Sequence, residues 1–285
     1  MSNTRALTGT ELGLVAGLLL YAAGAYLMQT VLGLSEPMSL SPLLSLVLAA
    51  IPAILWLVYF YLQDSHEPEP KHYVAGVYLL GALVSAQLSG FVLDSLLAAP
   101  EGIQFSSWTA ERIVYAIGIA GVTQELAKYV VVRYTIYRSP ELDEPLDGII
   151  YMTAAGIGFA TAENVHYLQG LDGSVFLGTG VINTVVTTLA HASFAGVLGF
   201  AMGIAKLGRF SPRVRAGILA GGLGAAAVLN GVFHLLEDSV RVSGLDVQPW
   251  HALWWAALFA AAIFAITLGL IRRQRLLSPH RSPSP

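Results

Sequence analysis

The chain consists of long apolar segments separated by short polar connections. A helix needs about 20 apolar residues to cross a hydrocarbon layer about 30 Å thick. Eight segments are long enough, at residues 11–34, 40–62, 73–96, 108–137, 147–168, 174–205, 214–238 and 249–271. We predict an all-α fold, a polytopic transmembrane helix bundle with about eight spans. It forms a single domain over residues 1–277, followed by a disordered Ser/Pro-rich tail over residues 278–285.

Composition supports a membrane location. Hydrophobic residues make up 55% of the 285 residues and charged residues only 12%, about half of the roughly 25% that is usual in soluble domains. The net charge of -3 gives no reason to expect a nucleic-acid partner. The chain contains no cysteine, which excludes disulfides, thiolate zinc ligands and a cysteine nucleophile.

Lysine and arginine residues are distributed unequally between the two sides of the predicted bundle. With a cytoplasmic N-terminus, twelve of the fifteen fall in cytoplasmic segments, and only Arg112 and Arg241 fall outside. Cytoplasmic segments of membrane proteins carry such an excess, so we predict that the N-terminus and the C-terminus are both cytoplasmic. The remaining basic residue, Lys128, lies within the fourth span.

Ionisable and amide side chains gather in spans four to seven. In lipid such residues are costly and usually face the bundle interior for a functional reason. They are Gln124, Glu125, Lys128, Glu163, Asn164, His166, His191, Asn230, His234, Glu237 and Asp238. At 1.5 Å per residue, Glu125 lies about 18 Å, Glu163 and His191 about 21–24 Å, and Asn230 and His234 about 24–30 Å from the cytoplasmic ends of their spans. This shared depth predicts one site formed by four helices.

The side chains in this layer suit more than one chemistry. Imidazole and carboxylate groups are suitable zinc ligands, and they also activate water as general bases without a metal. The residues alone leave both chemistries open. We assign Asn164 and His166 to hydrogen bonds between helices, and Glu237 with Asp238 to a solvated helix end.

Two glycine pairs predict close helix packing. Gly199 and Gly203 stand four residues apart in the sixth span, and Gly217 and Gly221 stand four apart in the seventh. This spacing allows two helix backbones to approach each other closely.

Several short motifs in the polar region together form a recognisable pattern. They are QELAK at 124–128, PLDGIIY at 145–151 and GIGFATAEN at 156–164, with His191, the Asn230-x-x-x-His234 spacing and the EPEP loop at 67–70. Over roughly residues 60–240 they resemble the PrsW family of intramembrane proteases. The chain is also similar to the CAAX-processing and bacteriocin-processing membrane proteases.

The resemblance implies a membrane-embedded endopeptidase, usually classed as a metalloprotease, in a bacterial inner membrane. It implies a membrane-protein or peptide substrate, such as a membrane-bound anti-sigma factor. Zinc is the implied cofactor, and metal-independent chemistry is the alternative. The family pattern begins Glu-Glu-x-x-Lys, whereas this chain has Gln124 before Glu125. Glutamine is no general base, so Glu125 carries the chemistry, or the protein is an inactive relative, or the residue was changed to trap a complex.

We therefore expect peptide hydrolysis in a water-accessible cavity within a catalytic core at residues 108–240. The expected ligands of zinc, or of the attacking water, are Glu163, His191 and His234. The expected catalytic residues are Gln124, Glu125, Lys128 and Asn230. Glu125 would be the general base or a further ligand, Lys128 would balance its charge, and Asn230 would donate to the oxyanion.

Two other functions are compatible with the same residues. An ion-coupled or proton-coupled transporter also needs inward-facing carboxylates and histidines. Transporters, however, often contain two related halves, and no second copy of the polar layer occurs in the first three spans. A catalytically inactive membrane scaffold is supported only by Gln124.

Overall fold

The computed structural model describes residues 2–34, 38–63, 68–97, 109–170, 175–242 and 250–277. Within these ranges the regular secondary structure is helical, so the predicted all-α fold is confirmed. The elements are α1 (Ser2–Val31), α2 (Pro42–Tyr61), α3 (Lys71–Leu80), η1 (Gly81–Ser85), α4 (Ala86–Ser95), α5 (Ala110–Val114), η2 (Tyr115–Gly121), α6 (Val122–Thr135), α7 (Pro145–Leu168), α8 (Leu177–Leu207), α9 (Pro212–Val242) and α10 (Trp250–Leu277). The predicted tail at 278–285 and Glu67 of the EPEP loop lie outside the described residues.

Two of the long helices contain a π-helical segment. In α3–η1–α4 and in α5–η2–α6 the three elements follow one another without a break, and η1 and η2 are π-helical. Insertions of this kind inside α-helices are frequent at functional sites. The second one directly precedes α6, the helix that carries Gln124, Glu125 and Lys128.

Six helical segments among the described residues are long and apolar enough to cross a membrane. They are Gly9–Val31, Pro42–Tyr61, Lys71–Ser95, Leu177–Leu207, Pro212–Glu237 and Trp254–Arg273. The other two predicted spans correspond to α5–η2–α6 and α7, which are helices but do not belong to this set. The total of eight spans and the cytoplasmic position of the termini stay predictions.

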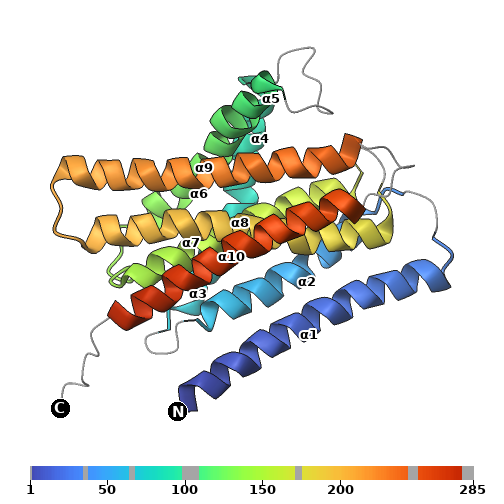
Figure 1. Ribbon diagram of the computed structural model, residues 1–285, viewed down its shortest axis with the longest axis horizontal. Coiled ribbons are helices and arrows are strands. Elements are labelled where there is room, and N and C mark those ends of the chain that lie inside the picture. Colours follow the sequence, from blue (N-terminus) through green and yellow to red (C-terminus); the bar gives the residue numbers. More distant parts are fainter. Residues whose placement is uncertain are drawn as a thin grey trace.

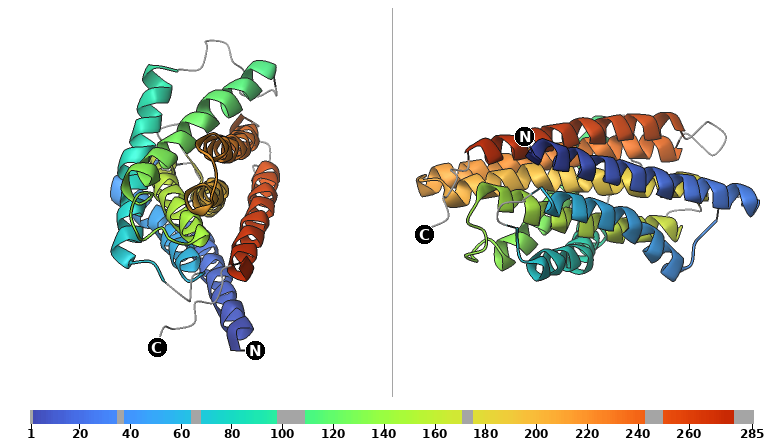
Figure 2. Two further views of the ribbon diagram at one scale, coloured as in Figure 1. Left: turned by 90° about the vertical axis from the view of Figure 1, so that its left-hand side faces the viewer. Right: turned by 90° about the horizontal axis from the view of Figure 1, so that it is seen from below.

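Helix α7 occupies the centre of the bundle. Every residue from Leu146 to Thr161 is buried, and α2, α3, η1 and α8 pack around it (Figures 1 and 2). Such all-round burial is expected of a helix with apolar residues on every face. Helices α8, α9 and α10 run side by side, while α4 and α5 stand at a steep angle to them (Figure 1).

The start of α7 is fixed by local hydrogen bonds. Pro145 occupies one of the first helical positions, where a missing N–H costs nothing. Glu144 and Asp147 form a capping box, in which each side chain accepts from the other residue's backbone N–H. One turn further, the Tyr151 hydroxyl donates to Glu69, a buried residue in the loop before α3. These bonds tie the EPEP loop to the central helix.

Glycines allow α7 and α8 to touch backbone to backbone. A Cβ on Gly199 would lie 2.2 Å from the carbonyl oxygen of Gly148, and a Cβ on Gly203 would lie 2.5 Å from that of Pro145. The predicted packing role of this pair is therefore confirmed. Gly217 and Gly221 make no such contact, since a Cβ on either would meet no atom of the described residues within 4 Å.

Candidate active site

Three helices bring the predicted metal ligands together. Glu163 lies near the end of α7, His191 in the middle of α8 and His234 in α9. One ligand atom from each lies within 4.8 Å of the other two. The His191 side chain is fully buried, whereas those of Glu163 and His234 are 30% and 22% exposed. The cluster is therefore closed on the α8 side and accessible on the other.

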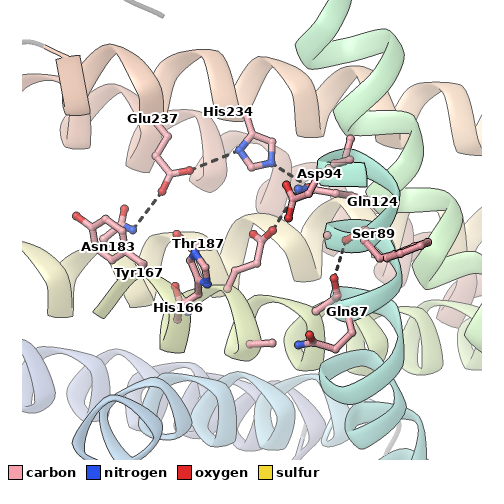
Figure 3. A pocket seen from close by; sticks show the side chains of 17 residues that line it. Gln87, Ser89, Asp94, Gln124, His166, Tyr167, Asn183, Thr187, His234 and Glu237 are labelled. Atoms are coloured by element: carbon pink, nitrogen blue, oxygen red, sulfur yellow. Dashed lines mark hydrogen bonds and ion pairs between the residues drawn. The ribbon is translucent and has the colours of Figure 1, made fainter. Parts of the chain in front are cut away.

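Gln124 lies between the carboxylate and the second imidazole. Its Nε2 donates to Glu163 Oε1 at 3.1 Å, and its Oε1 is 2.9 Å from His234 Nε2 (Figure 3). An amide oxygen only accepts hydrogen bonds, so His234 Nε2 carries the ring proton in this arrangement. Glutamine suits the position because it can donate to one neighbour and accept from the other. A glutamate would instead place a second carboxylate against Glu163.

Lys128 connects the cluster to a second, fully buried group of residues. Its Nζ lies 2.6 Å from Glu125 Oε1 and 2.8 Å from Nδ1 of His191. The Asn230 amide also donates to Glu125 Oε1, at 2.7 Å. The expected charge balance between Lys128 and Glu125 is therefore present. The contact from Lys128 to His191 had no signal in the sequence, because the two residues are 63 positions apart.

Two of the expected roles stay predictions. Successive residues of a helix point about 100° apart, so Gln124 faces the cluster while Glu125 faces Lys128 and Asn230. Glu125 is fully buried and, like His191, is not among the residues that line the cavity described below. Asn230 is fully buried too, and one N–H of its side-chain amide donates to Glu125.

His191 provides the test of whether zinc fits the cluster. Its Nε2 is 3.0 Å from Glu163 Oε2, yet it is a buried atom without a hydrogen bond among the described residues. A buried ring nitrogen 3.0 Å from a carboxylate oxygen and near a second imidazole suits a metal ion. Two histidines and one glutamate are also the ligands of known catalytic zinc sites. The donor set therefore fits zinc.

The tautomer of His191 separates the two chemistries that the sequence left open. If Nδ1 carries the ring proton, it donates to an unprotonated Lys128, and Nε2 is free to bind a metal. If Nε2 carries the proton, the Lys128 ammonium donates to Nδ1, and Nε2–H faces the Glu163 carboxylate. The first arrangement serves a metal centre, and the second serves metal-free chemistry on Glu163.

A cavity of about 400 Å³ lies against the cluster. Its polar lining residues are Gln87, Ser89, Asp94, Gln124, Glu163, Asn164, His166, Tyr167, Asn183, Thr187, His234 and Glu237 (Figure 3). The expected cavity in the catalytic core is therefore present, and its residues come from α6, α7, α8 and α9. Helix α4 supplies a further wall with Gln87, Ser89 and Asp94, which the sequence analysis did not include in the site.

Two further polar residues belong to the site. Glu237 is buried, so its assignment to a solvated helix end was wrong. The Asn183 amide donates to Glu237 Oε1 at 3.2 Å, and Glu237 Oε2 lies 3.7 Å from His234 Nδ1. The three-residue spacing between His234 and Glu237 could have indicated this contact, since such residues share a helix face. The Asp238 side chain is not among those that the structure describes.

Asn164 has the structural role predicted from the sequence. Its amide donates to the Thr184 carbonyl at 3.2 Å and to Thr188 Oγ1 at 3.1 Å, which joins α7 to α8. His166 lies at the cavity wall and is exposed.

A bundle of apolar helices with a Glu/His/His cluster beside a cavity is compatible with hydrolysis inside a membrane. Sequence comparison identifies the family. The model of the PrsW family intramembrane metalloproteases matches residues 69–266. The chain therefore belongs to the PrsW family, as the motifs predicted.

Two relatives show how far the similarity extends. The chain is 33% identical to Protease PrsW of Geobacillus kaustophilus over 219 residues, which cover 74% of this chain and 88% of that protein. It is 29% identical to Protease PrsW of Bacillus subtilis over 170 residues, which cover 58% and 70% of the two chains. No solved structure matches the chain.

Proposed function

We propose that this membrane protease hydrolyses a peptide bond of a membrane protein at Glu163, His191 and His234. The proposal is supported mainly by the position of these side chains, whose ligand atoms cluster within 4.8 Å beside a cavity. The substrate that we propose is a membrane-anchored protein of the anti-sigma-factor type. The location that we propose is the bacterial inner membrane, with the chain crossing it several times.

Zinc is the cofactor that we propose for this cluster. Bound to the carboxylate and the two imidazoles, it would polarise the peptide carbonyl and lower the pKa of the attacking water. The chain itself orients the ligands. Gln124 holds one oxygen of Glu163, and Lys128 holds the His191 ring from behind. Phe159, Phe194 and Phe233 pack against that ring and keep water away from its buried side.

The contact between Lys128 and His191 also favours a metal-free mechanism at the same site. With the Lys128 ammonium donating to Nδ1, the ring proton stays on Nε2, next to Glu163. Glu163 Oε2 would then accept the proton of a water molecule in the cavity as the general base. Gln124 cannot act as the general base in either mechanism, because its amide does not accept a proton near neutral pH.

The peptidase proposal can be tested in cells that express the wild-type protein or its Glu163→Gln variant. Mass spectrometry of newly formed protein N-termini in the membrane fraction would report every cleavage. We expect cleavage sites within or near transmembrane segments that occur only with the wild type. If neither protein produces them but Gln124→Glu does, the wild type is an inactive relative. If none of the three does, the proposal is wrong.

Elemental analysis of detergent-purified protein tests the cofactor. We expect about one zinc per chain in the wild type and none in His191→Ala. Protein that cleaves substrate with no bound metal, and that keeps its activity in a chelator, would establish the mechanism on Glu163 instead.

A further inference from the structure

His234 is the less constrained of the two histidines in the cluster. Its side chain is 22% exposed at the cavity wall, whereas His191 is fully buried among aromatic rings. Two oxygens compete for its single ring proton when the imidazole is neutral. Gln124 Oε1 lies 2.9 Å from Nε2, and Glu237 Oε2 lies 3.7 Å from Nδ1 (Figure 3).

The proton position decides what His234 can do. With the proton on Nε2, the ring donates to Gln124 and offers no lone pair to the cluster. With the proton on Nδ1, the ring donates toward Glu237, and Nε2 becomes an acceptor at the position that Gln124 Oε1 contacts. Only the second tautomer can bind a metal or accept a proton from water at Nε2.

Glu237 is positioned to stabilise that tautomer, although the 2.9 Å contact with Gln124 favours the proton on Nε2 in the structure described. It follows His234 by three residues in α9, so both side chains lie on one face of the helix. Asn183, which is buried in α8, donates to the opposite carboxylate oxygen at 3.2 Å. Glu237 is itself buried, and a buried carboxylate strongly favours neighbours that donate to it. The separation of 3.7 Å between Glu237 Oε2 and His234 Nδ1 is slightly longer than a hydrogen bond.

We propose that Glu237, anchored by Asn183, is a positioning residue that stabilises the Nδ1–H tautomer of His234 and thereby presents Nε2 to the cluster. A carboxylate bonded to the second nitrogen of a metal-ligating histidine is a recurrent arrangement. The inference rests on the proposed function of Glu163, His191 and His234. It adds that Gln124 and Glu237 stabilise opposite tautomers of the same ring.

Two substitutions of Glu237 distinguish positioning from a merely structural contribution. In Glu237→Gln, Asn183 keeps the amide oxygen on its own side, so the new NH₂ group faces His234 Nδ1 and donates to it. This variant therefore adds a donor that opposes the Nδ1–H tautomer, whereas Glu237→Ala only removes the acceptor that stabilises it and leaves the Gln124 contact in place. We expect zinc affinity to fall about 10-fold in Glu237→Ala and about 100-fold in Glu237→Gln, within the range measured for such partners of metal ligands.

A control variant separates this effect from loss of stability. Glu69→Gln removes another buried carboxylate, at the opposite end of α7, which accepts from Tyr151. We expect it to lower the unfolding midpoint but to leave zinc affinity unchanged. A purely structural role of Glu237 predicts the reverse order, with the isosteric Glu237→Gln milder than Glu237→Ala, and that order would overturn the inference.

The tautomer can also be measured without zinc, which keeps the test independent of the proposed function. The ring ¹⁵N resonances of His234 report which nitrogen carries the proton. We expect Nε2–H in the wild type and Nδ1–H in Gln124→Ala, because only Glu237 is then left to accept. In Gln124→Ala/Glu237→Gln the proton should stay on Nε2. If it stays on Nε2 in the single variant Gln124→Ala, the inference fails, whatever the protease assays show.

Discussion

The substitution Gly156→Ala tests how the helix packing positions the site. A Cβ at this position would lie 2.5 Å from the carbonyl oxygen of His191 and 2.8 Å from the Cβ of Ala195. Ordinary contacts begin at 3.4 Å, so α7 and α8 would have to separate by about 1 Å at the level of His191. Backbone atoms in a packed interior cannot rearrange as a flexible side chain can.

The expected cost follows from comparison with a glycine that has free space. Overpacking of this kind typically costs about 1–3 kcal/mol, while alanine gains up to about 1 kcal/mol over glycine through helix propensity. Gly217→Ala gains the propensity but meets no atom of the described residues within 4 Å. The difference in unfolding free energy between the two variants should therefore be about 1–3 kcal/mol, since the propensity contribution cancels.

The same displacement should affect catalysis. A misplacement of about 1 Å at a catalytic group can cost on the order of 100-fold in rate, so we expect such a loss of cleavage in Gly156→Ala and none in Gly217→Ala. SDS titration of the purified variants measures stability, and cleavage of a reconstituted substrate measures activity. Equal unfolding midpoints and equal activities would refute the packing between α7 and α8 described above.

The remaining predictions concern the stability contributed by buried polar side chains that do not line the cavity. In the arrangement with a Lys128 ammonium, Lys128→Met leaves the Glu125 carboxylate buried without its partner at 2.6 Å, so the metal-free variant should lose about 3–5 kcal/mol of stability. Glu125→Gln/Lys128→Met should recover most of that loss in the same SDS titration, and a double variant as unstable as the single one would contradict this explanation. Tyr151→Phe removes the donor to Glu69 and should cost about 1–3 kcal/mol. Ser45→Ala, which removes a buried hydroxyl without a partner among the described residues, should leave the unfolding midpoint unchanged.

The sequence predicted the helical class and the cluster for the same physical reason. Charges are expensive in lipid, so Glu163, His191 and His234 were conspicuous in apolar segments, and their similar depth indicated that they meet. The rise per residue gave the depth of each side chain, and the helix periodicity placed Gln124 and Glu125 in different directions. Which neighbours each of them contacts became visible only in the folded chain.

Residues near helix ends were harder to interpret. Glu237 lies at a depth where solvent was the simpler explanation, and its burial depends on Asn183, which comes from another helix. Gly217 and Gly221 have the same spacing as the packed pair Gly199 and Gly203, but only the second pair faces a close neighbour. Spacing identifies residues that share a helix face and does not identify what that face contacts.

The π-helical segment η2 (Tyr115–Gly121) has a consequence for how relatives are aligned with this chain. A π-turn contains one residue more than an α-turn, so it is the structural equivalent of a one-residue insertion within a continuous helix. It rotates everything that follows by roughly 100°, including Gln124 and Glu125. In a relative without the insertion, an alignment without a gap would pair Gln124 and Glu125 with residues that point roughly 100° away from them. A single gap inside the helix would pair residues that point the same way, and it would mark the π-turn.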